Sequence, residues 1–122
     1  MNTIINAITL IVALLHIYFL ILEMFLWTKP LGLKTFGQNL DKAKSSAILA
    51  ANQGLYNGFL AAGLIWSLCH PNEAFSGQLK LFFLSCVLIA GIYGGVSVNK
   101  KIIFVQGLPA FLGLLLILIK LF

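Results

Sequence analysis

Four long apolar segments constrain this chain more than any other feature of its sequence. A helix needs about 20 mostly apolar residues to cross a bilayer, since the hydrocarbon core is about 30 Å thick and the helix rises about 1.5 Å per residue. The segments that meet this requirement cover residues 4–27, 47–69, 79–98 and 102–122. With 61% hydrophobic and 9% charged residues, the chain has too little charge for an ordinary soluble domain or a disordered one.

We therefore predict an all-α, polytopic membrane protein, with four transmembrane helices in an antiparallel bundle that forms one domain over residues 1–122. In hydrocarbon, every backbone donor and acceptor must be bonded within the structure, which favours helices. The first segment does not resemble a cleavable signal peptide, because no basic residue precedes it and its apolar stretch is too long.

The basic residues, all of them lysines, predict the orientation. Those between the first two segments are Lys29, Lys34, Lys42 and Lys44; Lys100 and Lys101 lie between the last two, and Lys80 and Lys120 lie on the opposite side. Because basic residues stay on the cytoplasmic side, both termini are predicted outside (N-out/C-out). The net charge of +5 then indicates topology rather than nucleic-acid binding.

The connection over residues 28–46 is predicted to be cytoplasmic and to contain a short interfacial helix. Leu33, Phe36 and Leu40 recur at helical spacing, which favours a helix on the inner leaflet, attracted to anionic lipid. The headgroup contacts are expected at the four lysines of this connection, Lys29, Lys34, Lys42 and Lys44. Asp41 is the expected cap of the helix that follows.

Polar side chains gather in the cytoplasmic half of the predicted bundle. They are His16, Glu23, Trp27, Asn52, Gln53, Tyr56, Asn57, Tyr93 and Gln106. Counting from the inner helix ends, all of these groups except Trp27, which is expected at the interface, lie about 6–15 Å below the boundary, whereas the outer half holds almost nothing polar. Ionisable groups are costly in hydrocarbon and usually mark function, so we predict a polar pocket that opens toward the cytoplasm.

Small residues predict close helix packing. Gly54 and Gly58 are four residues apart, as are Gly91 and Gly95, and such stripes let helices approach each other closely. Both stripes are expected on other sides of their helices than the polar groups. They could join helices of one chain or form a homodimer. Pro109 predicts a kink, because its missing N–H removes a helical hydrogen bond.

No metal, cofactor or nucleophile motif is recognisable. Cys69 and Cys86 stand alone without a Cys-x-x-Cys pair. The sequence leaves a disulfide between them open, but free thiols that behave as small hydrophobic residues are the preferred interpretation. No cofactor is expected.

Three blocks of the sequence resemble a family of small bacterial integral membrane proteins of unknown function. The blocks are HIYFLILEMFLWTKPLGLKTFG (residues 16–37), NQGLYNGFLAAG (residues 52–63) and AGIYGGVSVNKKIIFVQGLPAFLG (residues 90–113). The resemblance implies four spans and a multi-pass location in the bacterial plasma membrane, and it supplies no established activity. Some members carry an epimerase label, which no residue here supports.

Three functions compete for the polar residues. The preferred hypothesis is a binding or transport protein for a small polar or amphipathic molecule, in which Glu23 pairs with a cation or proton. The second is a membrane-embedded acid/base enzyme that uses His16 and Glu23, although these lie about 10 Å apart along the helix axis, which is long for a shared atom. The third is a structural or accessory subunit in which the amides join helices.

Overall fold

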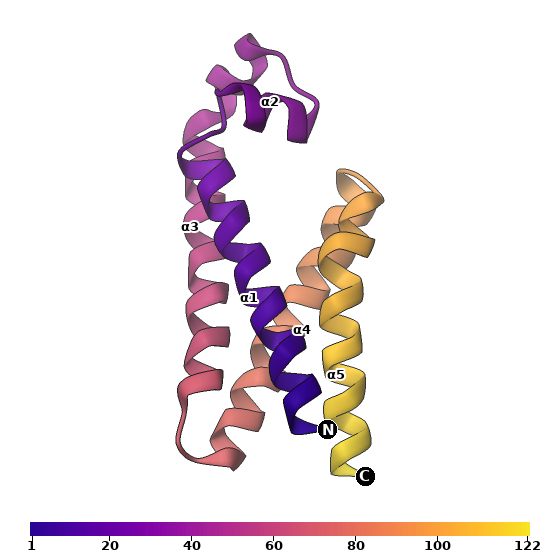
Figure 1. Cartoon of the computed structure of the whole chain (residues 1–122). Helices are drawn as coiled ribbons and strands as arrows, with labels where there is room; N and C mark the ends of the chain where they lie inside the picture. Colours follow the sequence, from indigo (N-terminus) through magenta and orange to yellow (C-terminus); the bar gives the residue numbers. More distant parts are fainter. The chain divides into compact units, whose positions relative to one another are not determined.

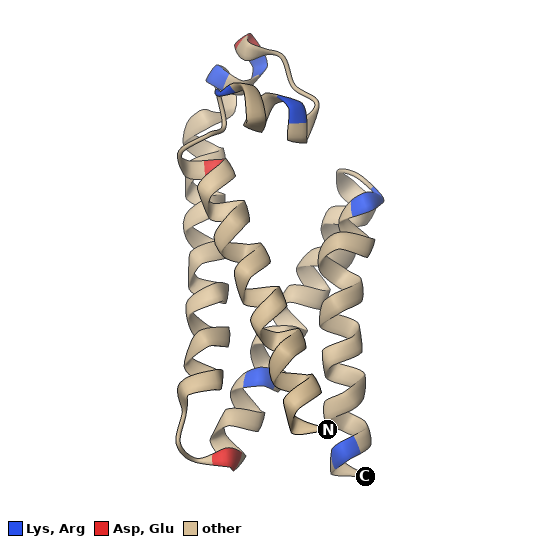
Figure 2. Ribbon diagram, in the orientation of Figure 1, with Lys and Arg blue, Asp and Glu red and all other residues tan.

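The computed structural model describes all of residues 1–122 and is helical throughout, which confirms the predicted all-α class (Figure 1). The elements in chain order are α1 (Asn2–Met24), α2 (Pro30–Phe36), α3 (Leu40–Cys69), α4 (Glu73–Ser97), the π-helical turn η1 (Ile103–Gly107) and α5 (Leu108–Leu121). Charged residues lie near helix ends, and long stretches between them carry none (Figure 2).

Three helical segments are long and apolar enough to cross a membrane: Asn2–Met24, Glu73–Ser97 and Ile103–Leu121. The predicted count of four is not confirmed. Helix α3 has 30 residues, but Asn52, Gln53 and Asn57 lie near its middle and lower its mean hydropathy. Large apolar side chains are exposed along every helix, among them Ile48, Val96 and Phe104. Such an apolar surface is compatible with a surrounding of lipid.

The chain forms two compact units, of which the first comprises Met1–Leu15 and Leu60–Phe122. Within it, α4 and α5 run antiparallel beside each other (Figure 1). Its core consists of apolar residues from four helices: Ile5, Val12, Ala13, Leu64, Leu84, Val87, Ala110, Leu114 and Ile117. Cys69 and Cys86 are both free thiols, as expected.

The contact between α4 and η1 depends on glycine. A methyl group at Gly91 would lie 2.8 Å from the backbone nitrogen of Gly107 and 2.9 Å from its Cα, so only a glycine allows this approach. The Leu108 N–H bonds to the Ile103 carbonyl, one residue beyond the α-helical partner. The structure therefore places a single π-helical turn, a rare element, two residues before Pro109.

The second unit comprises His16–Phe59, with the end of α1, all of α2 and the first part of α3. Helix α2 begins with Pro30 and ends at Phe36, and the Gly37 that follows has a left-handed φ of 62°, a conformation that glycine adopts at little cost. Leu40, expected in the same helix, instead begins α3. The prediction that Asp41 caps α3 is wrong. The cap is Asn39, whose side-chain oxygen accepts a hydrogen bond of 2.8 Å from the Lys42 N–H.

Gly54 and Gly58 on α3 lie against the end of α1 in this unit. A methyl group at Gly54 would meet Met24 Cγ at 2.8 Å and Glu23 Cβ at 3.0 Å, and one at Gly58 would meet Leu20 Cδ1 at 2.7 Å. Both glycines therefore pack against α1 of the same chain. The expectation that this stripe lies on another side of its helix than the polar groups is wrong, because Gly54 and Asn57 of α3 both meet Glu23 of α1.

Candidate functional site

Glu23 lies one residue before the end of α1 and is almost completely buried, with 4% of its surface exposed. The close approach of α3 at Gly54 brings the next turn of that helix within reach of the carboxylate. Asn57 Nδ2 donates a hydrogen bond of 2.6 Å to Glu23 Oε1. An acceptor-only carboxylate that is removed from water requires such a donor, since an unpaired buried charge is strongly destabilising.

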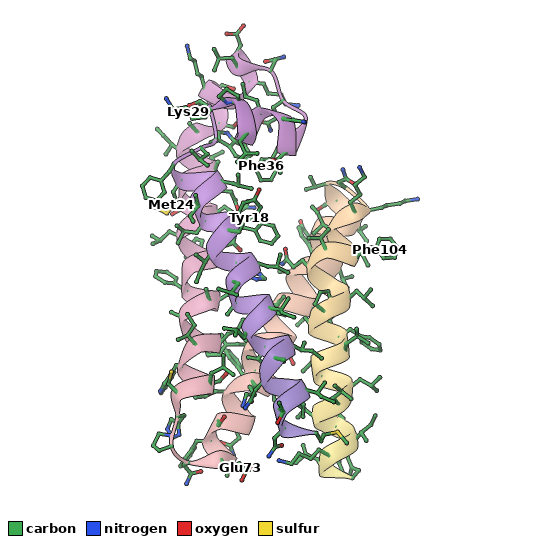
Figure 3. All side chains as sticks on the ribbon, viewed as in Figure 1. Tyr18, Met24, Lys29, Phe36, Glu73 and Phe104 are labelled. Atoms are coloured by element: carbon green, nitrogen blue, oxygen red, sulfur yellow. The ribbon has the colours of Figure 1, made fainter.

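Trp27 follows the end of α1 and is held in place by two partners. Its indole Nε1–H donates to Ser46 Oγ at 3.1 Å, and its ring packs against the ring of Phe36 with the centroids 4.7 Å apart. Phe36, which is labelled in Figure 3, is the last residue of α2. The Ser46 hydroxyl in turn donates to the Lys42 carbonyl at 2.9 Å. The indole is therefore fixed between α2 and the first turns of α3.

A pocket of about 330 Å³ lies between these groups. Its lining consists of Glu23, Trp27, Gln38, Lys42, Ser45, Ser46, Leu49, Ala50 and Gln53. This set combines a carboxylate, an ammonium group, two carboxamides, two hydroxyls and an aromatic ring. It can bind a small polar molecule through several directed hydrogen bonds and one stacking face. No three His, Cys, Asp or Glu side chains lie together as a metal site.

The other predicted site residues of this unit lie outside the pocket lining. His16 is fully buried and its ring packs edge-on against Phe19, with the centroids 5.5 Å apart. Asn52 is exposed, and so is Tyr56, whose ring contacts that of Phe59. The pocket therefore brings together Glu23, Trp27 and Gln53 of the predicted set, with Asn57 bonded to Glu23 beside it.

Tyr93 and Gln106 belong to the other compact unit. Tyr93 on α4 has 75% of its surface exposed. Gln106 lies in the π-helical turn η1, and its Nε2 donates to the Val87 carbonyl of α4 at 3.5 Å. Their role in a ligand site stays a prediction.

Gln38, Lys42, Ser45 and Ser46 line the pocket but are absent from the predicted site. The sequence assigns them to a connection, because the apolar segment that marks the second helix begins only at Ala47. One feature of the sequence could have indicated two of these residues. Lys42 and Ser46 are four residues apart, the spacing that puts two side chains on one helix face.

Comparisons with known proteins place this site in a wider context. A family model described as "Protein of unknown function (DUF1304)" matches residues 10–118, which include the whole pocket lining. A protein of Lactococcus lactis subsp. lactis (strain IL1403), named uncharacterized protein YpaA, is similar to this chain. The two are 32% identical over 111 aligned positions, and the alignment covers 88% of this chain and 90% of the relative. No solved structure matches the chain.

Proposed function

Because the chain belongs to the DUF1304 family of proteins of unknown function, we propose a function from the pocket itself. The protein is an integral membrane protein of the bacterial plasma membrane, and its Glu23 pocket binds a small polar or amphipathic molecule, which it holds or moves across the membrane.

The observation that carries this proposal is the buried carboxylate of Glu23 in a pocket. A charged side chain on an apolar helix is costly and usually serves a function. A carboxylate offers about four acceptor positions, so the single hydrogen bond from Asn57 leaves capacity for a ligand. The 330 Å³ beside it is enough for a small metabolite.

The lining also indicates the chemistry of the ligand. A cationic or N–H donor group of the ligand faces Glu23, and an acceptor group faces Lys42. Gln53 and the serine hydroxyls bond to its polar edges, and an apolar or planar part stacks on Trp27. Because the lining carries the negative charge of Glu23 and the positive charge of Lys42, the ligand that fits best has a donor group at one end and an acceptor group at the other.

The proposal includes four spans, with both termini outside and the lysines of residues 28–46 at the cytoplasmic surface, in contact with anionic headgroups. A helix of 30 residues is about 45 Å long, so α3 has the length of a span despite its amides. The orientation is tested by labelling intact cells with a membrane-impermeant maleimide. The variants Lys44→Cys, Lys100→Cys and Leu121→Cys are made one at a time in a Cys69→Ser, Cys86→Ser background. We expect labelling at residue 121 alone. Labelling at residue 44 or 100 contradicts the orientation.

Ligand binding is tested by thermal unfolding of the detergent-solubilised protein against a panel of amines, amino acids and other small zwitterions. We expect a compound that raises the unfolding temperature of the wild type and of Asp41→Asn, a control at an exposed carboxylate outside the pocket lining, but not of Glu23→Gln. Equal protection of Glu23→Gln, or no protecting compound in the panel, contradicts the proposal.

One contact favours a second candidate, a structural or accessory subunit. The hydrogen bond of 2.6 Å between Asn57 and Glu23 joins α3 to α1 without any ligand, as interhelical polar contacts do. In that case a double variant, Glu23→Leu with Asn57→Leu, should give cells the same phenotype as the wild type, because apolar groups replace both partners of the hydrogen bond. Loss of function in a double variant that still folds favours the binding protein.

A further inference from the structure

A second polar cluster lies where α1 begins and α5 ends. Glu73 is the first residue of α4 (Figure 3), and its Oε1 accepts hydrogen bonds from Lys120 Nζ at 3.0 Å and from Asn2 Nδ2 at 2.9 Å. Three helices of one compact unit thus meet at a single carboxylate. The sequence suggests no such cluster, because it predicts that this helix begins at Leu79.

Lys80 lies two turns further along α4 and is buried, with 8% of its surface exposed. Its Nζ donates to Ser76 Oγ at 2.8 Å, and the Ser76 hydroxyl donates its own proton to the Ser67 carbonyl at 2.6 Å. The hydroxyl therefore presents a lone pair to the ammonium group. An ammonium group has three donors. The acceptor of the Lys80 ammonium group in the structure is the neutral hydroxyl oxygen of Ser76.

The charges of the cluster do not balance. Glu73 is already shared by Lys120 and Asn2, so Lys80 has no carboxylate of its own. The two lysines and one glutamate leave one net positive charge, and part of it lies on a buried group. A buried cation is stable only when an anion or several acceptors compensate it.

These groups face a pocket of about 820 Å³ whose lining is mixed. Its polar lining includes Glu73, Ser76, Lys80 and Lys120, and its apolar lining includes Ile5 and Ile117. The polar lining fits a charged headgroup, and the apolar lining fits a hydrocarbon chain.

We propose that this pocket binds an amphiphile with one negative charge, whose phosphate diester or carboxylate accepts hydrogen bonds from Lys80 while its acyl chain lies along the apolar lining. One negative charge neutralises the net charge of the cluster. The site is separate from the Glu23 pocket and does not depend on the function proposed for it.

The test is a binding titration of the delipidated, full-length protein in a nonionic detergent, followed by native mass spectrometry. The probes are phosphatidylglycerol and oleate, with diacylglycerol as the uncharged control that lacks the acceptor and inorganic phosphate as the anion without a chain. We expect one molecule of an anionic amphiphile to bind about ten-fold or more tightly than diacylglycerol, the factor expected of one charge-assisted hydrogen bond. Phosphatidylglycerol and oleate distinguish a phosphate from a carboxylate headgroup.

Variants assign the effect to the cluster. Lys80→Gln should remove the preference for the anionic amphiphile, and Lys80→Arg should retain it. Glu73→Gln frees Lys120 and should strengthen binding, which keeps the proposal testable if Lys80→Gln does not fold. Lys101→Gln, an exposed lysine outside the pocket, should change nothing. The proposal is overturned if wild type shows no preference, if Lys80→Gln keeps it, or if inorganic phosphate binds as tightly as the amphiphiles.

Discussion

Replacing Gly54 by alanine tests the packing that builds the Glu23 pocket. The added methyl would lie 2.8 Å from Met24 Cγ, 3.0 Å from Glu23 Cβ and 3.3 Å from the Leu20 carbonyl oxygen. Met24 can move its side chain, but Glu23 Cβ and the carbonyl are fixed by the backbone of α1, so the two helices must separate by a few tenths of an ångström.

The expected free-energy change has two opposing parts. Overpacking of this kind costs about 1–3 kcal/mol, whereas alanine in a helix interior is favoured over glycine by about 0.5–1 kcal/mol. We therefore expect a net destabilisation of about 0–2.5 kcal/mol. Separation of the helices also lengthens the Asn57–Glu23 hydrogen bond, so the variant should bind the pocket ligand more weakly.

The assay is unfolding in mixed micelles of a mild detergent and SDS, followed by tryptophan fluorescence. Gly77→Ala is the matched control, because Gly77 also lies within a helix and a methyl there meets no atom within 4 Å; it should be stabilised by about 0.5–1 kcal/mol. If Gly54→Ala is as stable as Gly77→Ala, α3 does not approach α1 at this point and the described pocket is wrong.

Three further substitutions have defined outcomes in the same unfolding assay. Gly91→Ala places a methyl 2.8 Å from the backbone of Gly107, which cannot move aside, so we expect a larger loss than at Gly54; a neutral result contradicts the α4–η1 contact. Asn57→Leu removes the donor to Glu23 and should cost about 1–3 kcal/mol, with Asn52→Leu, at an exposed position, as the control that stays near wild type. Asn39→Ala removes the cap of α3 and should cost about 1 kcal/mol, whereas Asp41→Ala should cost less if Asn39 is the true cap.

The helices could be predicted from the sequence where hydrophobicity defines them. The apolar runs that contain Val12, Leu84 and Leu114 correspond to α1, α4 and α5, and each of these residues is buried in the core of its unit. The start of α3 could not be predicted in this way. It begins at Leu40, seven residues before the apolar segment, because its first turns are polar and depend on the Asn39 cap.

The candidate site could be predicted only in part, for a geometric reason. Glu23 stands out as a carboxylate in an apolar run, but Asn52 and Gln53 are equally polar neighbours, and only Gln53 lines the pocket. Successive residues point about 100° apart around a helix, so Asn52 and Gln53, which are both exposed, face different surroundings. Lys80 shows the same limit: its burial depends on Ser76 and on a carbonyl of another helix, Ser67.

An experimental structure of the protein in lipid nanodiscs, at a resolution that shows bound small molecules, tests the central claim most directly. We expect non-protein density in contact with both Glu23 and Gln53, beside the Trp27 ring. A pocket closed by protein side chains, with Glu23 bonded only to groups such as Asn57, would contradict a binding function for this site.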